Sequence, residues 1–327
     1  MKYVDLTDER IFGNDAGDDE DEESLNFYFY ERPEFQKFYD RTTPLRIVKA
    51  RKGTGKSALL RRTEAVARKK FSEDLFVTCK GPEISPDFSR AEVSSNPVLA
   101  WQRAICARIN RELGAKIKFA VTDDEISLVE AAELDSFRGR NLLSALSDRM
   151  LKKLPVVGVE RSRIAIGDEV QLLSRYSSND SQGVWFVVDD IDATFKNTEI
   201  DRAQRAAFFS ACRDLVQKVK GLTIRVAVRT DVWTLLRGAD EALDKCDQYV
   251  FNLRWSTEQV AYILVSKIDA YFQVHLKIPL VQGQSETVRK AQAFNAVFQP
   301  KFAWGRDNKI DSQSYVALYS QGRPRWS

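Results

Sequence analysis

The chain has little of the chemistry that cysteine and histidine supply. Its 327 residues include four cysteines and one histidine. The cysteines stand far apart with no C-x-x-C pair, which argues against a disulfide framework or a zinc site and makes a reducing cytoplasm the expected compartment. The single histidine excludes a multi-histidine metal centre and disfavours serine–histidine catalysis. We expect His275 to have a structural role.

Long apolar runs are also missing. The longest, such as residues 184–188, fall far short of the roughly 18–20 residues that a helix needs to span a bilayer. The first ten residues, MKYVDLTDER, contain no apolar segment typical of a secretory signal. We therefore expect no membrane association. A hydrophobic content of 43% with 11% aromatic residues indicates a globular, cored protein.

Charge is distributed unevenly along the chain. Residues 15–23, DAGDDEDEE, hold seven acids and no base. Because the net charge of the whole chain is +3, the remainder carries +10. We expect the acidic run to be a solvated segment. The basic remainder permits nucleic-acid binding without requiring it, so a nucleic-acid partner stays uncertain.

The hydrophobic pattern predicts a doubly wound, mostly parallel α/β fold. Short apolar, β-branched segments alternate with amphipathic helical segments, which is typical of strands joined by crossover helices. The loop after the first strand predicts a P-loop NTPase (nucleoside triphosphatase) sheet, with that strand at its centre. The predicted strands are 45–50, 75–80, 184–190, 222–230 and 248–255.

Three parts of the chain are predicted. Residues 1–44 form an acidic and aromatic arm, whose Phe27, Phe29, Phe35, Phe38 and Tyr39 should pack on the main domain. Residues 45–255 form the core, with a helical insertion at about 97–180 that could bind a protein partner. Residues 256–327 form a lid that is helical to its end, beginning at a capping box of Ser256 and Gln259.

The segment ARKGTGKS, residues 50–57, resembles a phosphate-binding loop that lacks its first glycine. The pattern G-x-x-x-x-G-K-[ST] has Ala50 at that place, which is tolerable if the φ angle there stays negative. Backbone N–H groups would wrap the phosphates, Lys56 would supply a cation, and Ser57 would offer a hydroxyl to Mg²⁺. The predicted nucleotide-binding residues are Ala50, Arg51, Lys52, Gly53, Thr54, Gly55, Lys56, Ser57 and Ala58.

The segment VWFVVDDID predicts the acidic half of the site. An apolar strand that ends in Asp189 suits a Mg²⁺-side carboxylate. Asp190 stands where many ATPases of this class have glutamate, and its shorter side chain predicts slow hydrolysis. Asp192 either assists Asp190 or caps the loop that follows it, and we favour the cap.

Two arginines are candidate sensors of the terminal phosphate. Arg229 ends the predicted strand 222–230, and its guanidinium either contacts the γ-phosphate or pairs with Asp231 or Asp189. Arg325, in GRPR near the end of the chain, either reaches the phosphates from the lid or belongs to an exposed basic tail.

Five motifs occur in the order of a prokaryotic P-loop ATPase family: ARKGTGKSALL, VWFVVDDID, RVAVRTDVW, NLRWSTEQV and GRPR. That family is similar to the AAA+ ATPases of origin-recognition complexes and to the STAND and KAP ATPases, and its N-terminal segment resembles residues 11–31. The resemblance implies ATP and ADP as ligands and Mg²⁺ as cofactor. It assigns the phosphate loop to Lys56 and Ser57, the metal to Asp189, catalysis to Asp190, and sensing to Arg229 and Arg325.

The leading hypothesis is a Mg²⁺-dependent ATPase whose slow hydrolysis drives a conformational switch or assembly, with a homo-oligomer left open. One alternative is a scaffold that holds nucleotide without hydrolysing it, because no clear arginine finger precedes the fifth strand. Another is an ATP-dependent DNA-loading module. Relatives usually continue into a C-terminal domain, often a winged helix, so the lid is expected to be truncated.

Overall fold

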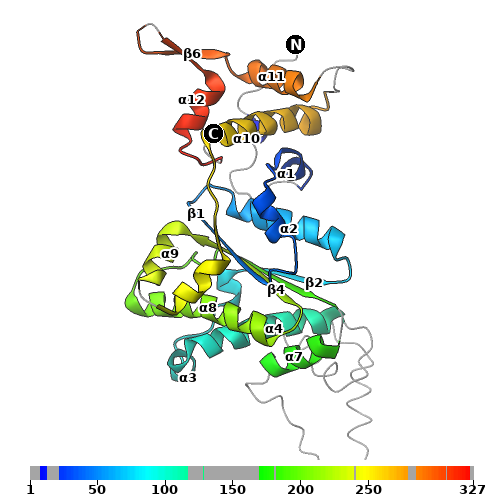
Figure 1. Cartoon of the computed structure of the whole chain (residues 1–327), viewed down its shortest axis with the longest axis vertical. Coiled ribbons are helices and arrows are strands. Elements are labelled where there is room, and N and C mark those ends of the chain that lie inside the picture. The colour runs from blue at the N-terminus through cyan, green and yellow to red at the C-terminus, as the bar shows by residue number, and fades with distance from the viewer. Residues whose placement is uncertain are drawn as a thin grey trace, which may run out of the picture.

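The computed structural model describes residues 8–12, 22–116, 128, 169–179, 182–238, 241–278, 285–306 and 308–324. Helices cover both faces of a central sheet, and a smaller group of C-terminal helices lies beyond the sheet (Figure 1). The α/β class predicted from the alternating pattern is therefore confirmed.

Five parallel strands form the sheet, in the order β2-β3-β4-β1-β5. Two strands have the predicted bounds, and the fifth is shorter than expected. The central position belongs to β4, so our placement of the first strand there was wrong, although β1 does pair with β4. The strands are β1 (Leu45–Ala50), β2 (Leu75–Lys80), β3 (Val184–Asp189), β4 (Leu222–Arg229) and β5 (Val250–Asn252).

Burial explains why these segments read as continuous apolar runs. Seven of the eight residues of β4 and five of the six of β3 are buried. Parallel strands covered on both faces show no polar alternation. The continuous apolar runs of β3 and β4 are therefore the consequence of their interior position in the sheet.

The connections place helices on the two faces of the sheet. The longer helices of this layer run between consecutive strands, and 3-10 segments lie at Pro33–Lys37, Gly81–Ile84 and Glu241–Tyr249. The helices are α1 (Glu22–Tyr28), α2 (Lys56–Lys70), α3 (Ala91–Ser95), α4 (Pro97–Lys116), α7 (Glu169–Asn179), α8 (Glu199–Lys218) and α9 (Thr230–Arg237).

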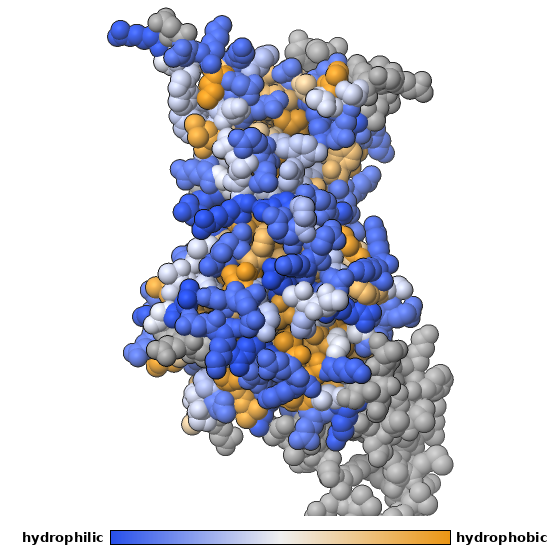
Figure 2. Space-filling view, viewed as in Figure 1, coloured by the Kyte–Doolittle hydropathy of each residue, from blue (hydrophilic) through white to orange (hydrophobic). Residues whose placement is uncertain are grey.

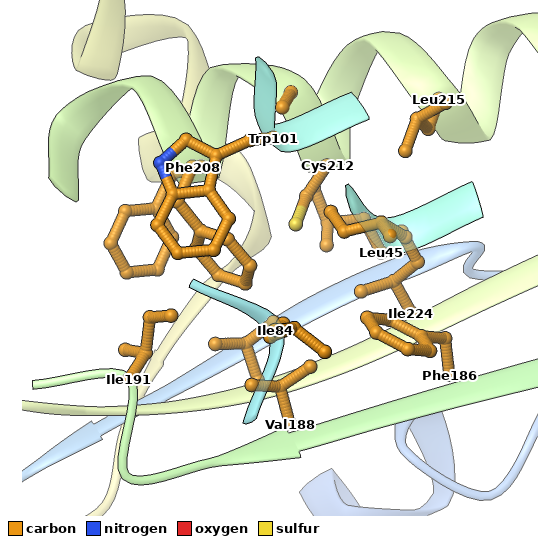
Figure 3. Close-up of a cluster of buried hydrophobic side chains, with 14 of the residues drawn as sticks. Leu45, Ile84, Trp101, Phe186, Val188, Ile191, Phe208, Cys212, Leu215 and Ile224 are labelled. Atoms are coloured by element: carbon orange, nitrogen blue, oxygen red, sulfur yellow. The ribbon is translucent and has the colours of Figure 1, made fainter. Parts of the chain in front are cut away.

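The larger core lies between the sheet and the layer of α4, α7, α8 and α9. Figure 3 shows Trp101 and Phe208 on the helix side of this core and Phe186 and Val188 on the sheet side. The Trp101 and Phe208 rings meet edge to face with centroids 5.0 Å apart. Burial of such large side chains is the main stabilising term of a fold of this kind.

The opposite face is covered by α2 and by the N-terminal arm. Phe35, Phe38 and Tyr39 pack with strand residues and with Leu59 and Leu60 of α2. The predicted packing of the arm is confirmed for these three aromatic residues. Phe27 does not follow them, because it remains 38% exposed.

Arg225 fastens the arm to the middle of the sheet. Its guanidinium is fully buried on β4 and donates to the carbonyl oxygens of Phe38, Asp40 and Ile224 at 2.8, 2.6 and 2.9 Å. It also lies over the Trp185 ring, 5.0 Å from the centroid. Burial lowers the pKa of this arginine, so the carbonyl acceptors stabilise a charge that the interior otherwise disfavours.

The C-terminal part contains α10 (Thr257–Ala270), which continues as a π-helical turn at Tyr271–His275, and α11 (Glu286–Val297) and α12 (Ser312–Tyr319). The predicted capping box at Ser256 and Gln259 is confirmed. The expectation of helix to the end was wrong, since β6 (Lys301–Trp304) and β7 (Asn308–Asp311) form an antiparallel hairpin. Gly305 lies between these two strands and has a φ of 76°, a backbone angle that suits a tight turn and not a helix.

The arm also reaches this C-terminal part. Ile11, in the 3-10 turn Glu9–Phe12, is fully buried among residues of α10 and α11. Asp8 accepts a hydrogen bond from the Tyr271 hydroxyl at 2.9 Å. One N-terminal segment thus contacts the lid, whereas Phe35 and Phe38 contact the sheet.

Much of the predicted insertion lies outside the described residues, as do most of the acidic run and Arg325. Its two ends, α4 and α7, are helical as expected. Across the described ranges, no helix combines the length and the apolar character that crossing a bilayer requires. The face in Figure 2 is mostly hydrophilic, with apolar residues in small groups.

Replacing Arg225 with leucine should cost about 3–5 kcal/mol of unfolding free energy, because it strands buried carbonyl groups of the arm. Urea unfolding measures this change. Arg90→Leu is the control, since Arg90 pairs with Asp87 at an exposed site and should change stability by less than about 1 kcal/mol. Equal small effects for both variants would contradict the anchoring role of Arg225.

Candidate functional site

The glycine loop, residues 51–55, joins β1 to α2. Gly53 and Gly55 have φ angles of 80° and 97°, a region that residues with a Cβ rarely adopt. Ala50, by contrast, is the last residue of β1, and its methyl group is buried against Leu59 and Leu60. The missing first glycine is therefore not needed here, because position 50 has ordinary strand geometry.

The first turn of α2 has no side-chain cap. Gly55 is the residue at the N-cap, and the first helical hydrogen bond runs from Leu59 N–H to the Gly55 carbonyl at 3.0 Å. The N–H groups before Leu59 consequently have no acceptor within the helix. A Cβ placed on Gly55 would meet nothing within 4 Å, so the loop borders open space. Unpaired donors and the helix dipole together favour an anion at this end.

A second loop, residues 190–193, follows β3 and is tightly held. Asp190 has a φ of 51°, which is unusual for a residue other than glycine. Gly81 is required beside it, because a Cβ there would lie 2.4 Å from the Ile191 Cα. Arg205 of α8 donates to the Ile191 carbonyl at 3.0 Å and to Thr194 Oγ1 at 2.7 Å. This packing fixes the acidic loop against the sheet.

Asp192 joins this loop to the end of β4. Its side chain is only 6% exposed, and its Oδ2 accepts the Arg229 N–H at 2.9 Å. This contact joins the loop to β4, and the expectation that Asp192 caps the loop after it stays a prediction. Burial raises the pKa of Asp192, although the Arg229 N–H and the nearby Lys56 charge oppose that rise.

Arg229 lies at the tip of β4, directly across from Ala50 in the strand register. Its guanidinium pairs with both carboxylate oxygens of Asp231, and Nε lies 3.2 Å from Oδ1. The predicted pairing with Asp231 is thus present. The Arg229 side chain remains 44% exposed and also borders the cavity described next.

A cavity of about 450 Å³ opens between these loops and the C-terminal helices. It has the size and the mixture of apolar walls and few polar groups that small-molecule sites have. Its lining residues are Leu25, Tyr28, Phe29, Tyr30, Lys52, Gly53, Thr54, Gly55, Lys56, Ser57, Ala58, Asp190, Asp192, Ala193, Arg229, Trp255, Ile263, Lys267 and Pro324.

The strand topology explains where this cavity lies. The helix that follows β1 covers one face of the sheet, and α9, which follows the adjacent β4, covers the other. Neighbouring strands whose connections diverge leave a crevice beyond their carboxyl ends. The glycine loop and Arg229 lie at this crevice.

Most of the predicted site residues meet here. Residues 52–58, Asp190 and Arg229 line the cavity, whereas Ala50, Arg51 and Asp189 do not. The Asp189 carboxylate accepts the Asp190 N–H at 2.8 Å. Arg325 lies outside the described residues, but Pro324 of the same motif lines the cavity. Whether these residues bind nucleotide stays a prediction.

Sequence reasoning missed the far wall of the cavity. Tyr28, Phe29 and Tyr30 come from the arm, and Lys267 comes from α10. The aromatic run LNFYFY was recognised only as packing, and no local pattern marks Lys267. That lysine donates to the Pro324 carbonyl at 2.9 Å and lies near the Tyr28 ring.

The described residues contain no group of three or more histidine, cysteine, aspartate or glutamate side chains suited to a metal ion. Mg²⁺ commonly uses only one or two protein oxygens and completes its shell with water and phosphate. Ser57 lines the cavity and offers an oxygen of that kind, and Asp189, the last residue of β3, directly precedes Asp190 at the same edge. The donor set therefore fits a Mg²⁺ that arrives with a phosphate ligand.

Comparison with known proteins gives no further guide to this site. No protein-family model matches the chain, and a search of curated proteins found no match. Function can therefore be inferred only from the residues and their geometry.

The raised pKa of Asp192 predicts a pH-dependent difference in stability. The folded carboxyl holds its proton to higher pH than the unfolded one, so this group lowers stability as pH rises through the carboxyl range. Asp192→Asn keeps an acceptor for Arg229 and removes that loss. Urea unfolding at pH 4 and pH 7 should show the variant gaining on the wild type as pH rises.

Asp87→Asn is the control for this measurement. Hydrogen bonds from Ser89 lower the pKa of the exposed Asp87, so its contribution to stability is lost as pH falls. That variant should instead lose ground to the wild type as pH rises. The same trend for both substitutions would contradict a penalty specific to buried Asp192.

Proposed function

We propose that the protein binds ATP with Mg²⁺ in this cavity, hydrolyses it slowly, and couples the nucleotide state to a conformational switch or assembly. The observation that carries the proposal is the uncapped start of α2 behind a two-glycine loop, facing Asp190 and Arg229 across one cavity. This arrangement supports a P-loop ATPase sheet, as the motif resemblance implies.

The phosphates would occupy the end of the cavity formed by the glycine loop. Free N–H groups at the start of a helix, backbone turned by positive φ angles and the Lys56 ammonium group suit a polyphosphate chain. Residues 52–58 line the cavity continuously, so a bound chain of phosphates would be surrounded by backbone.

The base would lie against the arm. Tyr28, Phe29, Tyr30 and Ile263 give the cavity an apolar and partly aromatic wall, opposite in character to the glycine loop. Aromatic faces stack on flat heterocycles. ATP over GTP follows from the family resemblance, since the sequence contains no N-K-x-D segment that reads guanine.

Magnesium would be held by Ser57 and by Asp189, the last residue of β3. When bound, the ion would neutralise charge on the β- and γ-phosphates. Because Asp190 lines the cavity and Asp189 does not, Asp189 would act through a bound water. Asp190 would orient the attacking water from a strained backbone position, and its short side chain would make turnover slow.

The lid would report which nucleotide is bound. Lys267 of α10 donates to the Pro324 carbonyl, which brings the GRPR segment to the cavity edge. An arginine beside Pro324 that contacts only the γ-phosphate would distinguish ATP from ADP and shift the lid accordingly. The assignment of that role to Arg325 remains a prediction, as do an oligomer, a partner at 97–180 and a cytoplasmic location.

A second candidate is a scaffold that holds nucleotide without hydrolysing it. The ion pair between Arg229 and Asp231 favours it, because a guanidinium held by Asp231 is not directed at a phosphate. Measuring ATP turnover with and without Mg²⁺, at several protein concentrations, distinguishes the two candidates. Turnover that requires Mg²⁺ supports the ATPase. Tight ATP binding with no turnover at any protein concentration supports the scaffold.

Lys56→Ala should reduce ATP affinity by at least about 100-fold, because it removes the cation closest to the phosphates. Isothermal titration calorimetry measures the affinity directly. Lys69→Ala, at the exposed end of the same helix, is the control and should bind like the wild type. Unchanged binding by Lys56→Ala would refute the phosphate role of the loop.

The two acids at the end of β3, Asp189 and Asp190, should have separable effects. Asp190→Asn should bind Mg²⁺-ATP with affinity close to that of the wild type but lose at least about 10-fold in turnover, since it removes the water-orienting carboxylate. Asp189→Asn should instead weaken the Mg²⁺ dependence of binding. Parent turnover in Asp190→Asn would transfer the catalytic assignment to Asp192.

A further inference from the structure

Trp255 connects the glycine loop to the start of the lid. Its indole Nε1–H donates to the Thr54 carbonyl oxygen at 2.7 Å. Trp255 directly precedes Ser256, the N-cap of α10, and it lines the cavity itself. Trp255 belongs to the motif NLRWSTEQV, but the resemblance assigns no role to its side chain.

The hydrogen bond is made at the most easily reoriented peptide of the loop. Thr54 stands between Gly53 and Gly55, both at positive φ, and glycine allows a peptide to flip at little steric cost. The peptide group is planar and trans, so its N–H points opposite to its C=O. By holding the Thr54 carbonyl, Trp255 also fixes the direction of the Gly55 N–H, one of the donors at the start of α2.

The rest of Thr54 adds little to this restraint. Its N–H donates to the Arg51 carbonyl over a long 3.4 Å. Thr54 is nevertheless buried, so its carbonyl would be costly to leave without a donor. The indole therefore satisfies a buried acceptor as well as orienting the loop.

Trp255 is itself held from the arm side. Arg32 Nη1–H donates to the neighbouring Arg254 carbonyl at 2.8 Å, and its guanidinium lies 5.5 Å from the Trp255 ring centroid. The rings of Tyr30 and Phe35 meet the indole edge to face at 5.9 and 6.1 Å. The indole is thus fixed by elements other than the loop that it restrains.

We propose that Trp255 is a positioning residue, which holds the glycine loop in its phosphate-ready conformation and ties that conformation to α10. This inference rests on the proposed nucleotide function. Only molecules with the loop in the competent conformation bind, so the apparent dissociation constant rises as that fraction falls. Because the coupling is reciprocal, a ligand that orders the loop also orders the beginning of the lid.

The test compares two replacements of Trp255 that differ in their donor. Trp255→Phe keeps an aromatic ring without N–H, and Trp255→His has a smaller ring that retains an N–H. Trp304→Phe is the matched control, because Trp304 lies on β6 against Tyr315 and outside the cavity lining. Each variant is characterised by thermal unfolding, ATP calorimetry, steady-state turnover and hydrogen exchange.

Trp255→Phe should bind ATP about 2- to 12-fold more weakly, the factor that one net hydrogen bond provides. KM of Trp255→Phe should rise, while its kcat should stay within about 2-fold of the wild-type value. Trp255→His should bind ATP more tightly than Trp255→Phe. Without nucleotide, amides of residues 53–58 should exchange faster in Trp255→Phe than in the wild type. Trp304→Phe should match the wild type throughout.

Two results would overturn the proposal. One is loop exchange and affinity in Trp255→Phe equal to those of the wild type. The other is a loss that follows ring size or unfolding alone, with Trp255→His no better than Trp255→Phe. Failure of the wild type to bind ATP would instead refute the proposed function, while the exchange experiment without nucleotide would still judge the role of Trp255.

Discussion

The parallel pairing of β1 with β4 is the contact on which the site depends. In that pairing Ala50 lies across from Arg229, so the glycine loop and the β4 tip emerge side by side. Their following helices cover opposite faces of the sheet, which opens the crevice between them. Because the next strand, β3, is also parallel, its acidic end reaches the same edge. The glycine loop, Arg229 and Asp190 therefore lie at one edge of the sheet because the three strands run in the same direction.

Contacts from distant parts of the chain close the crevice. The arm packs Phe35 and Phe38 on the sheet and Ile11 on α10 and α11, so it joins the two parts of the molecule. Its aromatic segment then becomes a wall of the cavity. Burial of one such apolar side chain contributes about 1.5–3 kcal/mol, so the contacts at both ends stabilise the position of the arm. The same N-terminal arm thus forms a wall of the cavity and contacts the C-terminal helices.

The sequence predicted the parts whose signals are local. The buried strands and the glycine loop followed from apolar runs bounded by a helix start, and residues 52–58 lie where that reasoning expected them. The central position of β4 in the sheet was not predicted, because hydrophobic periodicity does not indicate which strands pair. The partner of Asp192 was missed for a similar reason, since the Arg229 N–H is 37 residues away. The hairpin at 301–311 was read as helix because its strands have only four residues each.

In the proposed complex, one cavity receives the phosphates at the glycine loop and the base at the arm. Photoaffinity labelling with 8-azido-ATP, followed by mass spectrometry of the labelled peptides, tests this placement. We expect Mg²⁺-dependent labelling that excess ATP abolishes, on peptides that contain Tyr28 and Tyr30 or residues 257–267 of α10. Labelling that ATP does not compete, or that falls only on peptides away from this wall, would contradict it.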